Sequence, residues 1–393
     1  MPHTEDSDNY PIPRHTSAKK MLFVITQGEF GGAQRFISQL IANLDSSKFQ
    51  CTVVSGSNTG TGLSGWLPPS VPQTIMRYLR RNPNLLSDIR ALWELRGILL
   101  RDRPDILFLN SSKAGFIGSL AGHIARWQLP SLTVIYRIGG WSFHDPRPWY
   151  QRFIFRLLEK ISAQWKDYIV VNNRNDFDAA QRLGISPRKK LILIHNGIDP
   201  YLDFLSPQEA HQELFKETFI PKTLIGTIAN FYPTKGLDVF LEAMTRLPRE
   251  IGLVIIGDGS LRKDLEAKIK NYGLEYRVIL AGQLPDAWRY IPLFKIFVLS
   301  SLKEGFPWAV LEAMAAKVPV VATRVGAIPE LIEDKQNGII VPPGDSRSLA
   351  EAITTLLAND HLQQQYALAA HQTILKHFTL RHMVEQYEEL FLN

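Results

Sequence analysis

The sequence predicts an α/β protein of two domains, each built on its own parallel β-sheet. Short apolar runs that fit buried strands alternate with segments of helical periodicity along the chain. Alternation of this kind is typical of parallel sheets covered by helices. A turn-rich stretch, Asn196-Gly-Ile-Asp-Pro200, separates the two halves. With 393 residues, the chain is long enough for each half to bury its own core.

The predicted strands are apolar runs bounded by turn residues. In the first half they are Met21–Thr26, Cys51–Ser55, Ile106–Asn110, Leu132–Tyr136, Tyr168–Val171 and Leu191–Ile194. In the second half they are Leu224–Ala229, Leu253–Ile256, Val278–Ala281, Ile296–Leu299, Val318–Ala322 and Ile339–Val341. Helical patterns between them include Gln34–Leu44, Leu237–Leu247, Leu261–Lys270 and Leu349–Leu357.

The chain is expected to divide into four segments. Residues 1–18 are polar, lack the basic start and apolar centre of a signal peptide, and predict a disordered tail. Residues 19–195 and 196–372 are expected to form the two sheet domains. Residues 373–393 end a helical stretch that no strand follows.

Composition excludes several classes of protein. No uninterrupted apolar run reaches the roughly eighteen residues of a membrane-spanning helix. Cys51 is the only cysteine, so no internal disulfide forms, which fits a cytoplasmic location. No cluster of Cys and His has the spacing of a metal site, and no metal is predicted.

Charge is divided unevenly along the chain. Residues 1–195 carry 25 Lys and Arg against 14 Asp and Glu, a net +11, whereas the remainder carries −5. A basic half predicts an anionic partner, such as a membrane surface, a lipid-linked diphosphate or an acidic glycan. Nucleic acid would fit the charge, but no recognition motif for it is visible, and it is not expected.

The most informative motif runs from Ser301 to Glu312, directly after a predicted strand. Pro307 fits the first position of a helix, so nearby backbone N–H groups would lack helical partners and would favour an anion. Glu304 lies beside that anion site, and Glu312 lies a little over one turn inside the helix. Two glutamates at this spacing alone are a weak signal. With the helix start between them, they would suit a diphosphate flanked by two sugars, as in a nucleotide sugar.

Together with other motifs, this stretch resembles the retaining glycosyltransferases of family 4, which have the GT-B fold. The resemblance covers about residues 20–393. It includes Gly31-Gly32-Ala33-Gln34-Arg35, Asn196-Gly197-Ile198-Asp199, Lys235-Gly236-Leu237-Asp238, Gly257-Asp258-Gly259 and Gly326-Ala-Ile-Pro-Glu330. It implies two Rossmann-like domains that face each other across a cleft, with acceptor on the first and nucleotide-sugar donor on the second. It also implies a C-terminal helix that crosses back to the first domain.

The resemblance implies roles for several donor-side residues. Glu304 would hold the transferred sugar, Glu312 the ribose, and Lys235 the phosphates. A lysine at a helix start opposes the helix dipole, which favours this role over that of a solvated surface residue. The family usually has an arginine five residues earlier, where this chain has Asn230. The full predicted donor set is Gly31, Gly32, Asn230, Lys235, Gly257, Gly282, Glu304, Gly305, Phe306, Pro307 and Glu312.

The glycines of this set have a simpler alternative role. Gly31 and Gly32 would let backbone approach the diphosphate, or they are merely a tight turn. Gly257 and Gly282 would border the nucleobase pocket, or they are ordinary turns at strand ends.

Acceptor-side candidates follow two strands of the first half. Asn110 and Lys113 either face the cleft or belong to an ordinary helix start. Arg137 is a further cleft candidate. Many relatives have a catalytic histidine where this chain has Gly139, and His144, five residues later, is either its substitute or a surface residue.

The segment from Trp149 to Ile161 mixes aromatic, aliphatic and basic residues at helical spacing. It is either domain core with a solvated edge or an interfacial helix that rests on anionic lipid. The second alternative would make this a peripheral membrane protein at the inner face of the membrane.

The predicted reaction transfers a sugar from a nucleotide diphosphate to a hydroxyl of a glycan, a lipid-linked molecule or a small molecule, with retention. The resemblance implies no cofactor beyond a UDP- or GDP-linked co-substrate, no metal, and proton transfer to the departing phosphate. Glu304, Lys235 and His144 are the predicted catalytic residues. The alternatives are a nucleotide-sugar epimerase of the same fold and a non-catalytic nucleotide-sugar-binding protein.

Overall fold

The computed structural model describes residues 18–27, 31–56, 62–80, 82, 84–145, 147–215 and 221–393. The predicted tail therefore lies outside the described residues, apart from its last residue, Ala18.

The first sheet has seven parallel strands in the order β3-β2-β1-β4-β5-β6-β7. Its strands are β1 (Lys19–Ile25), β2 (Phe49–Gly56), β3 (Gln73–Met76), β4 (Ile106–Leu109), β5 (Thr133–Ile138), β6 (Tyr168–Val171) and β7 (Lys190–Leu193). All six predicted strands of this half are present. The sequence did not predict β3, because it lies at the sheet edge and only Met76 in it is buried.

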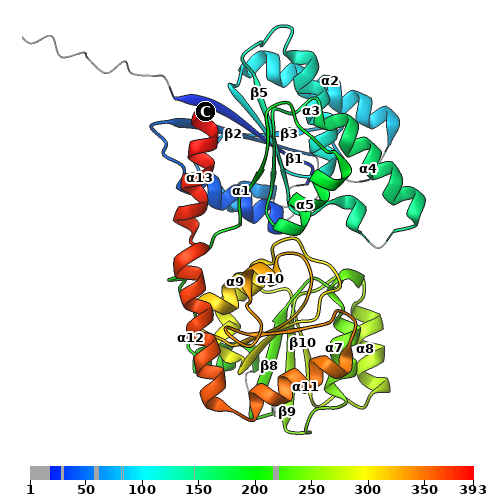
Figure 1. The fold of residues 1–393 in the computed structure, drawn as a ribbon, viewed down its shortest axis with the longest axis vertical. Helices are drawn as coiled ribbons and strands as arrows, with labels where there is room; N and C mark the ends of the chain where they lie inside the picture. Colours follow the sequence, from blue (N-terminus) through cyan, green and yellow to red (C-terminus); the bar gives the residue numbers. More distant parts are fainter. Residues whose placement is uncertain are drawn as a thin grey trace, which may run out of the picture.

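The second sheet has six parallel strands in the order β10-β9-β8-β11-β12-β13, and all six were predicted. Its strands are β8 (Thr223–Ile228), β9 (Ile251–Ile256), β10 (Val278–Gly282), β11 (Ile296–Leu299), β12 (Val320–Thr323) and β13 (Ile339–Val341). Two Rossmann-like sheets in one chain confirm the predicted fold class (Figure 1). The limits of the domains stay a prediction.

Helices cover both faces of each sheet, because the strands other than β3 alternate buried or half-buried side chains between two apolar clusters. In the first domain α2 (Leu85–Asp102), α3 (Ser112–Ala125), α4 (Trp149–Ala163) and α5 (Arg174–Leu183) cover one face and α1 (Gly32–Asn43) the other. In the second, α7 (Leu237–Met244), α8 (Arg262–Asn271) and α11 (Ser346–Leu357) lie opposite α6 (Pro207–Phe215), α9 (Trp308–Ala315), α10 (Ile328–Leu331) and α12 (Asp360–His377).

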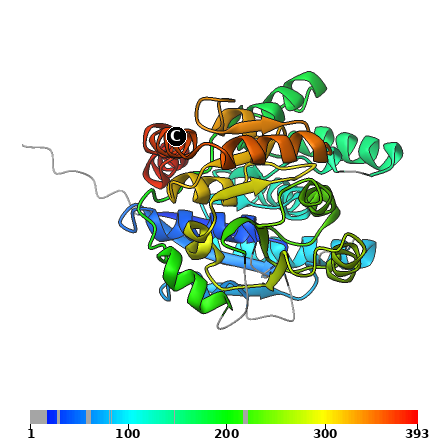
Figure 2. The same ribbon diagram turned by 90° about the horizontal axis from the view of Figure 1, so that it is seen from below.

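The last helix, α13 (Leu380–Leu392), returns to the first domain, as predicted. Its Tyr387 and Phe391 pack edge-on against Phe108 of β4, at centroid distances of 5.9 and 5.8 Å. In Figure 1 the red C-terminal helices run along one side of the molecule from the second domain to the first, and Figure 2 shows them nearly end-on at that side. Helix α13 therefore completes the core on the face that also carries α1.

Candidate functional site

The junction between β11 and α9 lies at the centre of the second sheet, next to β8. Helix α9 begins at Trp308, one residue later than predicted, and Pro307 is its N-cap. The N–H groups of Trp308 and Ala309 have no acceptor inside the helix, as at every helix start. The junction therefore offers backbone donors and the positive end of a helix dipole to an anion.

Lys235 and Glu304 meet at this junction. The Lys235 Nζ atom donates to Glu304 Oε1 at 2.7 Å, and Ser301 Oγ donates to the same oxygen at 2.6 Å. The Glu304 side chain is 9% exposed and that of Lys235 25%. Among the described residues no partner is found for Glu304 Oε2, and Lys235 has two further protons to donate. Each side chain thus keeps capacity for a ligand.

Backbone contacts between two loops hold this pair together. Ser300 Oγ donates to the Lys235 carbonyl at 3.0 Å, and Leu302 N donates to Thr234 O at 2.8 Å. Between the loops lies Gly236, whose φ is +57°. A Cβ atom on Gly236 would lie 2.2 Å from the Ser300 carbonyl oxygen, so a side chain there would push the loops apart.

Glu312 lies where α9 meets the first domain. Its carboxylate accepts a hydrogen bond from Arg35 of α1, and the Glu312 side chain is only 4% exposed. The Arg35 guanidinium also stacks over the Trp308 ring, 4.7 Å from its centroid, and Trp308 Nε1 donates to Gly32 O at 3.2 Å. The Gly31-Gly32 turn therefore contacts the start of α9. Both segments were predicted from the sequence to bind the donor.

A second contact between the domains joins the loops after β5 and β11. A Cβ atom on Gly305 would lie 1.9 Å from the Gly139 carbonyl oxygen, so position 305 leaves no room for a side chain. Lys303 Nζ donates to Trp141 O at 3.2 Å and forms an ion pair with Asp145. Gly139 thus lies directly against the Glu304 loop.

His144 is held elsewhere in the same loop. Its Nδ1 atom lies 3.2 Å from Asp176 Oδ1, and Asp176 is buried and also accepts from Asn173 at 2.8 Å. No contact between described residues joins His144 to Glu304 or Lys235.

The acceptor-side candidates lie deeper than the sequence suggested. Asn110 and Arg137 are 1% and 2% exposed. Arg137 donates to Asn110 Oδ1 at 3.3 Å and to Asn196 Oδ1 at 2.6 Å, and Asn196 donates to Phe306 O at 3.3 Å. Burial lowers the pKa of Arg137. These side chains form a buried polar chain that reaches Phe306, beside the Glu304 loop, and they do not line an open cleft as was expected. Lys113 donates a hydrogen bond to the Asn82 carbonyl oxygen and forms an ion pair with Asp88 of α2.

The predicted nucleobase side is formed by backbone. Gly257 N donates to Gly282 O at 2.8 Å, and a Cβ atom on Gly257 would lie 2.0 Å from Ala229 O. Asn230, which follows β8, is exposed. The structure thus brings the strand-end glycines together, with few side chains that could identify a base.

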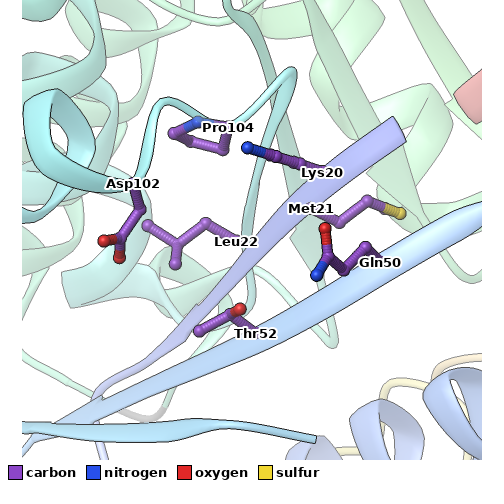
Figure 3. A pocket seen from close by; sticks show the side chains of 7 residues that line it. All are labelled: Lys20, Met21, Leu22, Gln50, Thr52, Asp102 and Pro104. Atoms are coloured by element: carbon purple, nitrogen blue, oxygen red, sulfur yellow. The ribbon is translucent and has the colours of Figure 1, made fainter. Parts of the chain in front are cut away.

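A shallow hollow of about 200 Å³ lies at the opposite edge of the first sheet, by the amino ends of its strands (Figure 3). Its lining consists of Lys20, Met21, Leu22, Gln50, Thr52, Asp102 and Pro104. In open α/β sheets ligands bind beyond the carboxyl ends of the strands, so this hollow is not the predicted site.

The described part of the chain contains no group of three or more His, Cys, Asp or Glu placed to hold a metal ion. None of its helices combines the length and apolarity needed to cross a bilayer.

Sequence reasoning missed three residues that shape the site. Ser301 orients Glu304, and Arg35 and Trp308 contact Glu312 or the Gly31-Gly32 turn. Arg35 belongs to the motif Gly31-Gly32-Ala33-Gln34-Arg35. Its position one turn inside a helix that follows two glycines was the signal that could have identified it. Its partner Glu312 is 277 residues away, which no local pattern reveals.

Two family models together match most of the chain. The glycosyltransferase family 4 model matches residues 30–202, and the glycosyl transferases group 1 model matches residues 211–373. The chain is 24% identical to the Escherichia coli UDP-Gal:alpha-D-GlcNAc-diphosphoundecaprenol alpha-1,3-galactosyltransferase, over 92% of this chain and 94% of that protein.

Two further likenesses cover about half of the chain and the whole fold. The chain is 30% identical to the Campylobacter jejuni N-acetylgalactosamine-N,N'-diacetylbacillosaminyl-diphospho-undecaprenol 4-alpha-N-acetylgalactosaminyltransferase, over 51% of this chain and 53% of that protein. The structure of Anabaena Alr3699/HepE in complex with UDP and glucose superposes with a TM-score of 0.81 at 21% identity, covering 95% of this chain and 100% of the other. The chain belongs to glycosyltransferase family 4 and has the GT-B fold.

Proposed function

We propose that this glycosyltransferase moves a hexosyl group from a UDP-sugar to a hydroxyl of a lipid-linked glycan in the cytoplasm, with retention of configuration. The observation that carries the proposal is the Lys235–Glu304 pair beside the start of α9, with Glu312 eight residues further on. UDP and a diphosphoundecaprenol acceptor are supported by the name of the Escherichia coli relative, and a lipid-linked acceptor also by that of the Campylobacter jejuni relative.

In the proposed reaction, the bond between the sugar's anomeric carbon and the diphosphate breaks. Negative charge grows on the leaving diphosphate, and positive charge grows on the sugar. Lys235 and the free N–H groups of α9 are preorganised donors for that negative charge, which is the property that lowers such barriers. Because these groups supply the positive charge, the proposed reaction proceeds without a metal. Asn230 contributes at most a hydrogen bond.

In the proposed complex the two glutamates bind different parts of the donor. Glu304 Oε1 is occupied by Lys235 and Ser301, which leaves Oε2 to accept from a hydroxyl of the transferred sugar. Glu312 accepts from the ribose hydroxyls, while Arg35 fixes the orientation of its carboxylate. Arg35 is in this sense a positioning residue.

The acceptor enters from the first domain, opposite the Glu304 loop. Its hydroxyl forms the new bond on the face that the diphosphate leaves, and its proton passes to a departing phosphate oxygen. The His144–Asp176 contact favours one alternative for this step, because a carboxylate that orients an imidazole is a common arrangement for a general base. In that case an attack on the opposite face, with inversion, becomes possible.

A ligand screen tests the proposal first. A UDP-sugar should raise the melting temperature more than GDP- or ADP-sugars, since a ligand of the native state stabilises it by mass action. Transfer to an undecaprenyl-diphosphate-linked sugar, followed by NMR of the new anomeric bond, should show retention and should continue in EDTA. Donor turnover without acceptor would indicate an epimerase. Binding without transfer to any acceptor would indicate a non-catalytic binding protein.

A further inference from the structure

Helix α4 turns its apolar side outward. Six of its large apolar side chains are about half exposed or more: Trp149 (79%), Tyr150 (50%), Phe153 (59%), Ile154 (50%), Leu157 (48%) and Ile161 (47%). Their spacing places them on one continuous face of the helix. This arrangement excludes the expectation that the stripe is domain core.

The inner side of α4 is held by polar contacts. Glu159 is buried against Lys166, at 3.3 Å from its Nζ, and accepts from Tyr136 Oη at 3.2 Å. Arg152 Nε donates to the Phe143 carbonyl at 3.2 Å. Rotating the helix to bury its apolar face would move Glu159 to the surface. Lys166 would then remain buried without its ion-pair partner, which is energetically costly. The outward face is therefore fixed by the fold.

Helix α2 adds a second exposed apolar strip on the same side of the sheet. Leu85, Leu86, Ile89 and Trp93 are 77%, 70%, 46% and 55% exposed. Helix α3 packs between α2 and α4, and in Figure 1 all three lie on the side away from α13. Both α2 and α4 begin at the carboxyl edge of the first sheet. This surface, which we call the α2–α4 face, therefore adjoins that edge.

The charges around the α2–α4 face are mainly positive. On α4, Lys160 is exposed, Arg152 and Arg156 are half-buried beside Phe143, and the single acid, Glu159, is buried. On α2, Arg90 is exposed, and the guanidinium of Arg96 lies 5.7 Å from the centroid of the Trp93 ring. The acids of α2 are engaged elsewhere, for example Asp88 with Lys113. Large exposed apolar patches mark interaction sites, and cations around one favour an anionic partner.

We propose that the α2–α4 face docks on an anionic lipid bilayer. Its aromatic and aliphatic side chains enter the boundary between headgroups and acyl chains, and its cations contact lipid phosphates. Docking in this orientation brings the carboxyl edge of the first sheet, and with it the cleft, close to the membrane surface. The inference concerns binding alone and does not depend on the proposed reaction.

Vesicle co-sedimentation tests the proposal. The full chain should bind vesicles of phosphatidylglycerol and phosphatidylcholine, bind vesicles of phosphatidylcholine alone much more weakly, and be released by high salt. Phe153→Ser with Leu157→Ser should lower the partition coefficient at least about tenfold, because each lost side chain contributes more than 1 kcal/mol of apolar burial. The matched control is Tyr276→Ser with Leu368→Ser, two exposed apolar residues outside the face, which should bind like the wild type.

Other outcomes would overturn the proposal. These are no binding to phosphatidylglycerol vesicles, equal binding to neutral vesicles, or equal loss in the control. Sedimentation velocity showing a dimer that the α4 variant dissociates would assign the face to a second copy instead. A second pair, Ile154→Ser with Ile161→Ser, guards against misfolding, and thermal melts should match the wild type. The vesicles hold no donor or acceptor, so failure here leaves the proposed transfer untouched.

Discussion

Replacing Lys235 by methionine removes one charge from the proposed diphosphate site while keeping side-chain length. Its Nζ atom is the only side-chain cation that contacts Glu304 among the described residues, at 2.7 Å. Asn230, five residues earlier, is uncharged and adds no positive charge to this site. Loss of one preorganised donor to a developing anion typically lowers kcat about 10²–10³-fold, which corresponds to roughly 3–4 kcal/mol. We expect Lys235→Met to show a loss of this size.

The effect on stability should be smaller. Glu304 keeps its hydrogen bond from Ser301, and Lys235 is a quarter exposed, so water replaces part of the lost contact. Removing one partner of such a bond costs about 1–3 kcal/mol in free energy of unfolding. The variant should therefore remain folded at assay temperature, which circular dichroism melts can verify.

The assay is UDP release at saturating donor and acceptor. Lys268→Met is the matched control, because Lys268 pairs with Asp238 in the same domain at 3.3 Å but is 42% exposed. A surface pair of this kind contributes about 0–1 kcal/mol, and the control should keep wild-type kcat. A Lys235→Met enzyme within threefold of wild type, or a control with the same loss, would refute the reasoning.

Three further predictions concern burial and orientation. Lys166→Met should lower the free energy of unfolding by about 3–5 kcal/mol in urea melts, because Glu159 stays buried without its cation. Adding Glu159→Gln should recover most of this loss. An equal loss in the single and the double variant would argue against the ion pair. Burial raises the pKa of Cys51 to about 12. At pH 8 its thiolate fraction is thus about a thousandfold below that of an unfolded chain, and iodoacetamide should label it correspondingly slowly, whereas equal labelling in buffer and urea would contradict this. Arg35→Met should weaken UDP binding about tenfold in calorimetry, since Glu312 loses its orienting partner. Arg35→Lys should restore part of the affinity for UDP. An unchanged affinity in Arg35→Met would exclude Arg35 as a positioning residue.

Strand positions could be predicted from sequence because strands buried on both faces are nearly continuous apolar runs. Strand β3 could not, since an edge strand with one buried residue carries no such run. The motif from Ser301 to Glu312 predicted the strand-to-helix junction between β11 and α9, because its glycine, proline and helix signals are all local in sequence.

Contacts between distant segments were beyond sequence reasoning. The Arg35–Glu312 pair, the buried Arg137–Asn196 chain and the outward face of α4 each depend on how separate elements pack. Periodicity showed that α4 has an apolar stripe but not which way it faces. That orientation follows from Glu159, whose buried partner Lys166 lies beyond the helix.

The most direct test of the account is a calorimetric comparison of UDP and the UDP-sugar binding to two single variants. If Glu304 binds the transferred sugar and Glu312 binds the ribose, Glu312→Ala should lower the affinity for UDP and for the UDP-sugar by a similar factor. Glu304→Ala should leave UDP affinity unchanged and remove the additional affinity that the sugar provides. Loss of UDP binding in Glu304→Ala with wild-type affinity in Glu312→Ala, or no change in either variant, would contradict the donor site described for this chain.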